Sequence, residues 1–420
     1  MHIGLVCPDL TGHLNPGCSL SRELVRRGHR VSLVGLRTMA PKATAQGLGF
    51  VPLGTTVEGE QVAQGWRRLG EAAGFSALRH TGQVLRDATT VTLRDLPAAI
   101  DQHQLDALIV DQVSPAGAVV ADRVALPYVV ACNALALQVE PGVPPCPVTW
   151  RYREGLIWRL RNRLSVRAMR FVFERLAGAA APGGVSPLLL AEDHGRGLAH
   201  IAQQPALFDF PRRELPEHFH YTGPWHAAGR DAAEAFPWNW LDGRPLVYAS
   251  LGTLQNKLRP VYQAIADAAA GLDVQVVLAL GDRDPGFGVA APPNVLVVGY
   301  APQLPLLDRA AAAITHAGLN TALECLVRGV PMVCVPITND QPGVASRVAW
   351  LGLGELVLPR RATAPRLRAA LERVLAHTGY RAAAERCRVS LADHRGAERA
   401  ADVVEQAFST GKRVLRSAAA

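Results

Sequence analysis

Short apolar runs alternate with helical patterns along most of the chain. Residues 2–7 (HIGLVC) predict a buried strand, residues 16–27 predict a helix that ends at Gly28, and residues 30–35 (RVSLVG) predict a second strand. Such a strand–helix–strand unit is typical of a parallel, doubly wound sheet. The same patterns predict further strands at 107–110, 128–131, 245–250, 274–280, 295–298, 311–315 and 331–335, and further helices at 116–124, 318–328 and 403–415.

The expected strands fall into two groups that are separated by residues 211–244. This segment is rich in Pro, Gly, Trp and charged residues and has no apolar period, which is typical of a linker. We therefore expect two α/β domains, residues 1–226 and residues 227–395, with 227–244 as the linker between them. A C-terminal segment follows at residues 396–420.

Length and composition agree with two packed domains and exclude a disordered chain. Of the 420 residues, 49% are hydrophobic and 19% are charged. Lys and Arg number 44 against 36 Asp and Glu, a formal net charge of +8. This excess permits nucleic acid, anionic lipid or a phosphorylated substrate as a partner, and a compositional bias toward Arg explains it equally well. Because the sequence contains no recognised nucleic-acid-binding module, we expect no nucleic-acid partner.

The cysteines and the N-terminus indicate the compartment. Seven cysteines are scattered along the chain without a C-x-x-C pair, which argues against a disulfide framework and against a zinc site. The first ten residues have no basic leader, and the most apolar long stretch, residues 124–139, is shorter than the roughly 20 residues of a spanning helix. We expect a soluble, cytoplasmic protein that is at most peripheral to the inner face of the membrane.

One long stretch carries most of the functional information. Residues 299–347 read GYAPQLPLLDRAAAAITHAGLNTALECLVRGVPMVCVPITNDQPGVASR. They resemble the nucleotide-sugar-binding signature of the family 1 UDP-glycosyltransferases, in the bacterial branch of the zeaxanthin and macrolide-type glycosyltransferases. The TGHLNP motif at 11–16 and Asp111 match the same family, so the resemblance covers nearly the whole chain. The loop after the first strand holds a single glycine, Gly12, which disfavours a dinucleotide-dependent dehydrogenase.

The resemblance implies the GT-B fold, in which two doubly wound, Rossmann-like domains face each other across a cleft. The first domain would bind the acceptor and the second would bind the nucleotide sugar. The C-terminal helix would return to the first domain.

The residues at the start of the helix expected at 318 suit a diphosphate. A helix N-terminus offers unpaired N–H groups and the positive end of its dipole, and Gly318 lets a phosphate approach the backbone closely. His316 can donate a further hydrogen bond, and Asn320 and Thr321 lie in the first turn, where Thr321 offers a hydroxyl. These groups can hold a pyrophosphate without a metal, and we find no convincing D-x-D pair. We expect no metal and no cofactor, with a UDP-sugar as co-substrate.

The resemblance implies roles for five further residues on the donor side. Glu324 would accept hydrogen bonds from both ribose hydroxyls, which favours UDP over dTDP because a deoxyribose leaves an acceptor unpaired. Tyr300 stands where plant members have a uracil-stacking Trp, and Gln303 would read the base or the ribose. Asp340 and Gln341 would hold hydroxyls of the transferred sugar, and Gln in the second place usually goes with glucose.

Gly252 and Thr253 follow the strand expected at 245–250. They would face the phosphates from the other side of the site. An ordinary glycine-containing turn is the alternative.

His13 and Asp111 are the candidate catalytic pair. His13 follows the first expected strand and Asp111 ends another, so both lie at the carboxyl edge of a parallel sheet, where clefts form. Sugar transfer to an alcohol needs a base. An imidazole titrates near neutrality, and a carboxylate on its far nitrogen fixes the tautomer. The family uses such a pair in a single inverting displacement. The alternatives are a residue that begins a helix for His13 and a helix N-cap for Asp111.

Acceptor recognition is expected in the N-terminal half. Residues 150–178 (WRYREGLIWRLRNRLSVRAMRFVFERLAG) interleave Arg with apolar residues at helical spacing, the pattern of a basic amphipathic helix pair. One hypothesis is a patch that contacts a membrane and takes a lipophilic acceptor from it. The alternative is a helix beside the cleft whose Arg face is solvated. Residues 126–139 could line an acceptor pocket and could equally be core.

The expected function is the metal-independent, inverting transfer of glucose from UDP-glucose to a hydroxyl of a lipophilic small molecule. A hydroxylated carotenoid is favoured, and a polyketide, phenol or flavonoid is the alternative. Two other classes share this architecture. A nucleotide-sugar epimerase needs acidic catalytic groups in place of TGHLNP, and a non-catalytic sugar-nucleotide-binding protein turns over no acceptor.

Overall fold

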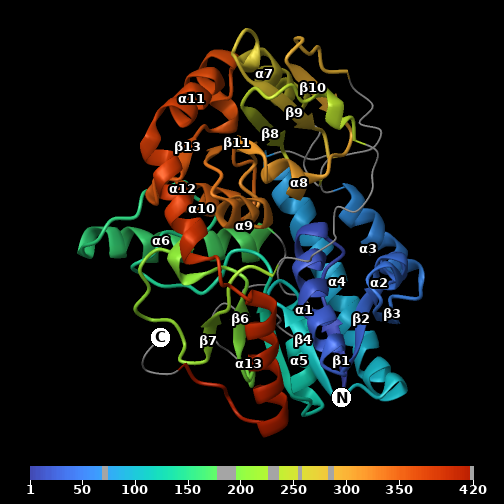
Figure 1. The fold of residues 1–420 in the computed structure, drawn as a ribbon. Helices are drawn as coiled ribbons and strands as arrows, with labels where there is room; N and C mark the ends of the chain where they lie inside the picture. Colours follow the sequence, from blue (N-terminus) through green and yellow to red (C-terminus); the bar gives the residue numbers. More distant parts are fainter. Residues whose placement is uncertain (69–73, 177–194, 226–235, 254–257, 282–287, 417–420) are drawn as a thin grey trace.

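The structure is a computed structural model that describes residues 1–68, 74–176, 195–225, 236–253, 258–281 and 288–416. Two α/β bodies lie one above the other, the first half of the chain below and most of the second half above (Figure 1). We call them the N-terminal and the C-terminal domain after the sheet on which each is built. These are the two doubly wound, Rossmann-like domains of the predicted GT-B fold.

Each domain is built on a parallel sheet with the same winding. The strand order is β3-β2-β1-β4-β5-β6-β7 in the first sheet and β10-β9-β8-β11-β12-β13 in the second. In both sheets, the strands are first added on one side of the first strand (β1 or β8) and then on the other side. The connections that follow the two adjacent central strands therefore run over opposite faces of the sheet. The first sheet contains β1 (His2–Val6), β2 (Arg30–Leu36), β3 (Gly49–Leu53), β4 (Ala107–Asp111), β5 (Tyr128–Cys132), β6 (His200–Ala202) and β7 (Phe219–Tyr221). The second contains β8 (Leu246–Ser250), β9 (Gln275–Ala279), β10 (Val295–Val298), β11 (Ala310–Thr315), β12 (Met332–Cys334) and β13 (Gly354–Leu356).

Helices follow the strands and cover the sheets. The helices before the second sheet are α1 (Thr11–Arg26), α2 (Ala40–Ala45), α3 (Val57–Arg68), α4 (Gly74–His103), α5 (Pro115–Arg123) and α6 (Leu156–Leu176). The helices that follow β8, the first strand of the second sheet, are α7 (Arg259–Ala269), α8 (Gln303–Leu307), α9 (Leu319–Arg328), α10 (Gln341–Trp350), α11 (Ala364–Ala376), α12 (Thr378–Ser390) and α13 (Gly396–Thr410). Among the described residues, no helix is both long enough and apolar enough to cross a bilayer.

The cores explain why the strands are continuous apolar runs. In β8, Leu246 and Tyr248 pack into one apolar cluster while Val247 and Ala249 pack into another on the opposite face. A sheet that is covered on both faces has no solvated side, so alternation is lost. The predicted strands are confirmed within one or two residues at their ends.

Helix α1 differs from the prediction. It begins at Thr11 and not near residue 16, so His13 lies in its first turn and not in a loop. The Leu10 carbonyl accepts the N–H groups of His13 and Leu14, 2.9 Å each. Pro16, which was expected to begin the helix, lies inside it, and because proline has no N–H the Gly12 carbonyl loses its intrahelical donor.

Helix α13 also begins earlier than predicted, at Gly396, and it ends at Thr410 where Gly411 is left-handed, with φ 62°. It packs against α1, β5 and β6 of the N-terminal domain. Arg27, the residue that follows α1, holds it through ion pairs with Asp402 at 2.6 Å and Glu405 at 2.7 Å.

The chain passes between the domains on two segments that touch each other. It leaves the N-terminal domain after Gly223 and Pro224 and returns at His394 to Gly396. A Cβ on Gly396 would lie 2.2 Å from the Pro224 carbonyl oxygen, and one on Gly223 would lie 2.3 Å from the His394 ring. The predicted boundary at residue 226 and the first part of the predicted linker at 227–244 lie outside the described residues.

Candidate functional site

The predicted catalytic pair forms a hydrogen bond. His13 stands in the first turn of α1, directly after β1, and Asp111 is the last residue of β4, which pairs with β1. His13 Nδ1 lies 2.9 Å from Asp111 Oδ2. The His13 side chain is 15% exposed and that of Asp111 is fully buried. Because the carboxylate accepts, Nδ1 donates and Nε2 is left as the basic nitrogen.

Three groups besides His13 fix the Asp111 carboxylate. The backbone N–H of Val113 donates to Oδ1 at 2.8 Å, and Asn133 Nδ2 donates to Oδ2 at 2.7 Å. The Cys7 thiol lies 3.8 Å from the same oxygen. Sequence reasoning missed Asn133 and Cys7, although each follows a strand of the first sheet and so shares the carboxyl edge with Asp111.

The environment makes His13 a stronger base. Burial lowers the pKa of the imidazole, but the nearby Asp111 carboxylate outweighs burial, so the pKa lies above its ordinary value of 6.5. The carboxylate of Asp340, from the C-terminal domain, acts in the same direction.

The predicted phosphate site lies where β11 turns into α9. Gly318 is the N-cap of α9, and the backbone reaches it through Ala317 in the left-handed region at φ 63°. Thr315 Oγ1 accepts the Ala317 N–H at 3.1 Å and holds this turn. The first N–H groups of α9 have no partners within the helix and are therefore available to an anion.

The His316 imidazole lies between the two predicted glycines. A Cβ on Gly252 would lie 2.8 Å from the ring, and one on Gly318 would lie 2.6 Å from Nε2. Glycine at 318 therefore makes room for the imidazole, a reason that sequence reasoning did not give. Burial lowers the pKa of His316 to about 4, so the ring is neutral at neutral pH. Thr253, the neighbour of Gly252, is exposed.

The predicted nucleoside residues cluster around α8 and α9. Glu324 is fully buried in α9, and Gln303 Nε2 donates to its Oε2. Gln303 also approaches Thr321 Oγ1 at 3.3 Å and accepts from Tyr248 Oη at 3.0 Å. Tyr300, after β10, is 43% exposed, so part of this side chain is accessible to a ligand.

The predicted sugar residues stand at the start of α10 and lie against the N-terminal domain. Asp340 is the N-cap of α10, and its Oδ2 accepts the Leu135 N–H at 3.0 Å. Burial raises the pKa of Asp340. Gln341 Oε1 accepts the N–H groups of Ile337 and Thr338 at 2.8 and 3.0 Å, so the Gln341 amide N–H groups face outward from this turn.

A hydrogen-bond chain joins the two halves of the site. Asn320 Nδ2 donates at 3.0 Å to the Gly12 carbonyl that Pro16 leaves unpaired. Gln203 Nε2, from the N-terminal domain, donates to Asn320 Oδ1 at 2.8 Å and to the backbone carbonyl of Asn133. The predicted phosphate residue Asn320 thus binds the N-terminal domain in this structure, and Gln203 was not predicted.

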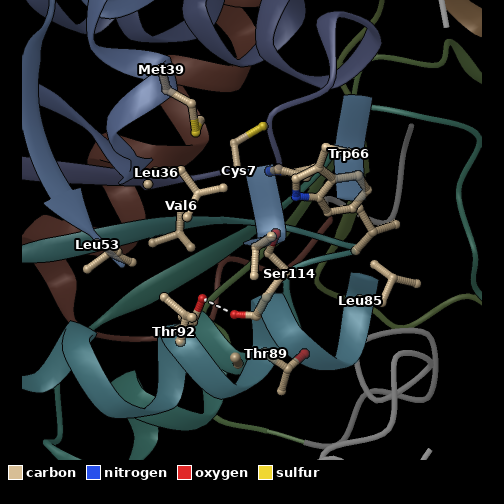
Figure 2. A pocket seen from close by; sticks show the side chains of 17 residues that line it. Val6, Cys7, Leu36, Met39, Leu53, Trp66, Leu85, Thr89, Thr92 and Ser114 are labelled. Carbon is tan, nitrogen blue, oxygen red and sulfur yellow. Dashed lines mark hydrogen bonds between the residues drawn. The ribbon is translucent and has the colours of Figure 1, made fainter. Parts of the chain in front are cut away.

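A small hollow adjoins the catalytic pair in the N-terminal domain. It lies at the carboxyl ends of β1 to β4 under α3 and α4, and Figure 2 shows Cys7, Leu36, Trp66 and Ser114 around it. Its volume is about 60 Å³, room for a few water molecules, so a larger apolar ligand enters by displacing side chains. Residues 126–139, the other predicted acceptor lining, contribute β5, which is buried core.

In each sheet, the candidate site residues follow the two central strands between which the strand order reverses. The catalytic pair follows β1 and β4, and Gly252 and His316 follow β8 and β11, which occupy the same places in the second winding. Two doubly wound domains that bring a histidine–aspartate pair near a helix N-terminus have the architecture of a GT-B glycosyltransferase. The chain belongs to the UDP-glucoronosyl and UDP-glucosyl transferase family, whose family model matches residues 72–390.

Individual relatives span nearly the whole chain. It is 30% identical over 424 residues to the zeaxanthin glucosyltransferase of Pantoea ananas, a match that covers 99% of this chain and 97% of that protein. It is 31% identical over 433 residues to the zeaxanthin glucosyltransferase of Pseudescherichia vulneris, over 98% and 99% of the two chains. Among solved structures, the kitacinnamycin glycosyltransferase superimposes with a TM-score of 0.72 at 26% identity and covers 96% of this chain and 98% of that one.

Proposed function

We propose that this glycosyltransferase moves glucose from UDP-glucose to a hydroxyl of a lipophilic small molecule, with a hydroxylated carotenoid as the favoured acceptor. The observation that carries the proposal is the hydrogen bond between His13 and Asp111, which lies beside the N-terminus of α9. The hydrogen bond from Asn320 of α9 to the Gly12 carbonyl of α1 holds the two helix starts together. A base and a phosphate site at this junction are what sugar transfer to an alcohol needs.

The reaction is a single inverting displacement. His13 Nε2 takes the proton of the acceptor hydroxyl while that oxygen attacks the anomeric carbon, and Asp111 stabilises the imidazolium that forms. The bond from the anomeric carbon to the β-phosphate oxygen breaks, and UDP leaves. The N–H groups of α9 and the hydroxyl of Thr321 stabilise the charge on the leaving diphosphate. An α-linked donor thus yields a β-glycoside.

The donor side supports UDP-glucose. Glu324 offers carboxylate oxygens for two ribose hydroxyls, and Tyr300 offers a ring face for the uracil. Asp340 and the outward N–H groups of Gln341 would bind glucose hydroxyls. Gly252 and Thr253 would complete the phosphate site beside His316.

The acceptor side rests on the relatives and on the apolar hollow. Two of the relatives are named for glucosyl transfer to zeaxanthin, a carotenoid diol. The hollow is lined mainly by apolar side chains, and one of its lining residues, Cys7, lies 3.8 Å from Asp111 Oδ2, so an apolar group held there would place its hydroxyl on the side of the His13–Asp111 pair. A polyketide, phenol or flavonoid remains the alternative acceptor.

Glycoside formation tests the proposal directly. UDP-glucose is offered with zeaxanthin, a polyketide and a phenol, and hexose adducts are measured by mass spectrometry for wild type, His13→Ala and His29→Ala. We expect a zeaxanthin glucoside whose rate falls about 10²- to 10⁴-fold in His13→Ala, because the general base is lost. His29→Ala, which removes a histidine near α13, serves as the matched control.

Donor binding separates the outcomes. Titration calorimetry with UDP should give the same affinity for wild type and His13→Ala. An adduct on the phenol or the polyketide alone would identify that compound class as the acceptor in place of a carotenoid. No adduct on any acceptor, with UDP bound, contradicts catalysis and favours a sugar-nucleotide-binding protein, and release of an epimerised UDP-sugar identifies an epimerase.

Metal independence has its own measurement. Because N–H groups and Thr321 meet the diphosphate, we expect an excess of EDTA to leave kcat unchanged. Loss of activity in EDTA that Mg²⁺ restores would overturn this part of the proposal.

A further inference from the structure

Helix α6 turns its apolar stripe away from the protein. Leu156 is 85% exposed, Ile157 78% and Leu160 57%, and Leu164 and Phe171 continue the stripe at helical spacing. The side of α6 that faces the protein carries Asn162, which is buried and donates to the Pro141 carbonyl at 3.1 Å. A surface helix normally has the opposite arrangement, and an exposed apolar stripe of this kind marks an interaction site.

The flanks of the stripe are cationic. Arg163 borders one side and Arg161 the other, and Arg167 is exposed near the stripe itself, whereas Arg159 is paired with Glu214 at 2.8 Å. The Arg161 guanidinium stacks on two tryptophans, 4.1 Å from the ring of Trp150 and 4.8 Å from that of Trp158. From residue 156 to residue 173 the sequence has no acidic residue.

A hollow of about 230 Å³ lies beside α6 and suits a phosphate group. It is lined by Arg163, Arg167 and Arg170 together with Glu140 and Asn162. Even without Arg170, the guanidinium groups of Arg163 and Arg167 outnumber the Glu140 carboxylate among these lining residues. Neither Arg163 nor Arg167 forms an ion pair in the described part of the chain, so both guanidinium groups are available to an anion.

We propose that α6 docks the protein onto the surface of an anionic phospholipid bilayer. The exposed leucines, Ile157 and Phe171 enter the boundary between head groups and acyl chains, and the flanking arginines bind lipid phosphates. Helix α6 projects from the junction of the two domains (Figure 1), so a flat membrane surface can reach the stripe along the helix. This surface is independent of the sugar and of the acceptor proposed above.

A second copy of this chain fits the stripe less well. Two α6 helices packed stripe to stripe would bring Arg163 and Arg167 of one copy close to the same residues of the other. Like charges at close range oppose this pairing, whereas lipid phosphates neutralise them.

Vesicle co-sedimentation of the full chain tests the proposal. Phosphatidylcholine vesicles with and without phosphatidylglycerol are offered at low and at high salt. We expect binding to the anionic vesicles to exceed binding to the neutral ones by about tenfold or more, and salt to release the protein. Binding to neither vesicle at low salt, or equal binding to both, would overturn the proposal.

Two pairs of matched variants locate the surface. Arg163→Glu/Arg167→Glu and Ile157→Gln/Leu160→Gln should each weaken anionic-vesicle binding about tenfold or more. The controls are Arg259→Glu/Arg366→Glu on α7 and α11, and Val57→Gln/Val124→Gln at the start of α3 and just after α5. They change exposed residues elsewhere and should bind as wild type does.

Circular dichroism confirms that each variant folds, since every changed side chain is exposed. Full binding by both α6 variants would show that another surface meets the lipid. A dimer in sedimentation velocity that Ile157→Gln/Leu160→Gln dissolves, without vesicle binding, would assign the stripe to a second copy.

Discussion

At the scale of single residues, the site depends on protonation states that neighbouring groups determine. Asp111 holds the His13 proton on Nδ1, and Asn133 and the Val113 N–H hold Asp111. Burial lowers the pKa of His316 and keeps the ring neutral beside the proposed diphosphate site. The proposed base and the proposed phosphate ligand are therefore both imidazoles, with pKa values moved in opposite directions.

The His13 pKa predicts the pH dependence of the reaction. The base must be neutral, and its pKa is raised above 6.5, so kcat/KM should rise with pH through a midpoint above 6.5. In Asp111→Asn the main cause of the increase is removed, so the midpoint should move to lower pH while the plateau falls. Initial rates across pH for both proteins check this prediction. An unchanged midpoint would show that Asp111 does not raise the pKa of the group that controls the rate.

Gly318→Ala should weaken donor binding. The new Cβ would lie 2.6 Å from His316 Nε2, so the imidazole must move out of the phosphate site. We expect the Kd of UDP to rise about tenfold, as for other overpacked sites. Gly288→Ala, where a Cβ meets nothing within 4 Å, is the control. Equal UDP affinity in all three proteins would show that the imidazole does not contribute.

At the scale of elements, α1 and α9 are joined where the hydrogen bonding of α1 is interrupted. Pro16 removes one intrahelical bond, and the freed Gly12 carbonyl accepts Asn320 Nδ2 from the other domain. The same asparagine accepts from Gln203. The first turns of the helices that carry the base and the phosphate site are thereby joined directly.

Asn320→Ala should weaken this junction. Two hydrogen bonds between the domains are lost and the Gly12 carbonyl is left unpaired, which should lower the free energy of unfolding by about 1–3 kcal/mol. Urea denaturation without UDP measures this difference. Asn239→Ala, at an exposed asparagine, is the control, and an equal midpoint for both variants would mean that solvent replaces Asn320 without loss.

Elements with buried apolar runs could be predicted from the sequence, and elements that depend on distant partners could not. The strands β8 and β11 and the helix start at Gly318 follow from local pattern and capping. The start of α1 was misplaced because the partner that compensates for Pro16 lies some 300 positions away. The motif led us to expect that His13 and Asp111 lie together, and they form a hydrogen bond, whereas Asn133 and Gln203 carry no motif and become visible only through their contacts.

At the scale of the whole molecule, a buried ion pair ties the domains together. Arg347 of α10 donates to Asp209 of the N-terminal domain through Nε at 3.0 Å and Nη2 at 2.6 Å, and both side chains are almost fully buried. Arg212 also binds Asp209, at 3.0 Å. α10 begins at the proposed sugar residues, so this pair fixes one wall of the site against the other domain.

Removing Arg347 should destabilise the protein strongly. In Arg347→Met the Asp209 carboxylate loses a partner in a buried place, so the free energy of unfolding should fall by about 3–5 kcal/mol. Arg388→Met, which breaks an exposed pair with Glu385, is the control and should leave the urea midpoint unchanged. Equal midpoints in the two variants would show that the remaining donors to Asp209, among them Arg212 and the Tyr221 hydroxyl, satisfy the carboxylate without Arg347.

The same pair predicts sensitivity to acid. Burial alone would raise the pKa of Asp209, but Arg347 and Arg212 outweigh it and lower the pKa to about 2. The unfolded carboxyl titrates near 3.8, so its contribution to stability is complete above 3.8 and is lost as the pH falls toward 2. Urea midpoints between pH 5 and pH 2 should therefore fall more steeply in wild type than in Asp209→Asn.

The two touching passages between the domains have a mechanical consequence. A single connection would let one domain swivel freely on the other. Here Gly223 and Pro224 press against His394 and Gly396, with α13 anchored to α1 beyond them. The close packing of the two passages therefore restrains torsion of one domain about the other. The register of His13 against α9 is thus held from two sides, by these passages and by the buried pair of Arg347 and Asp209.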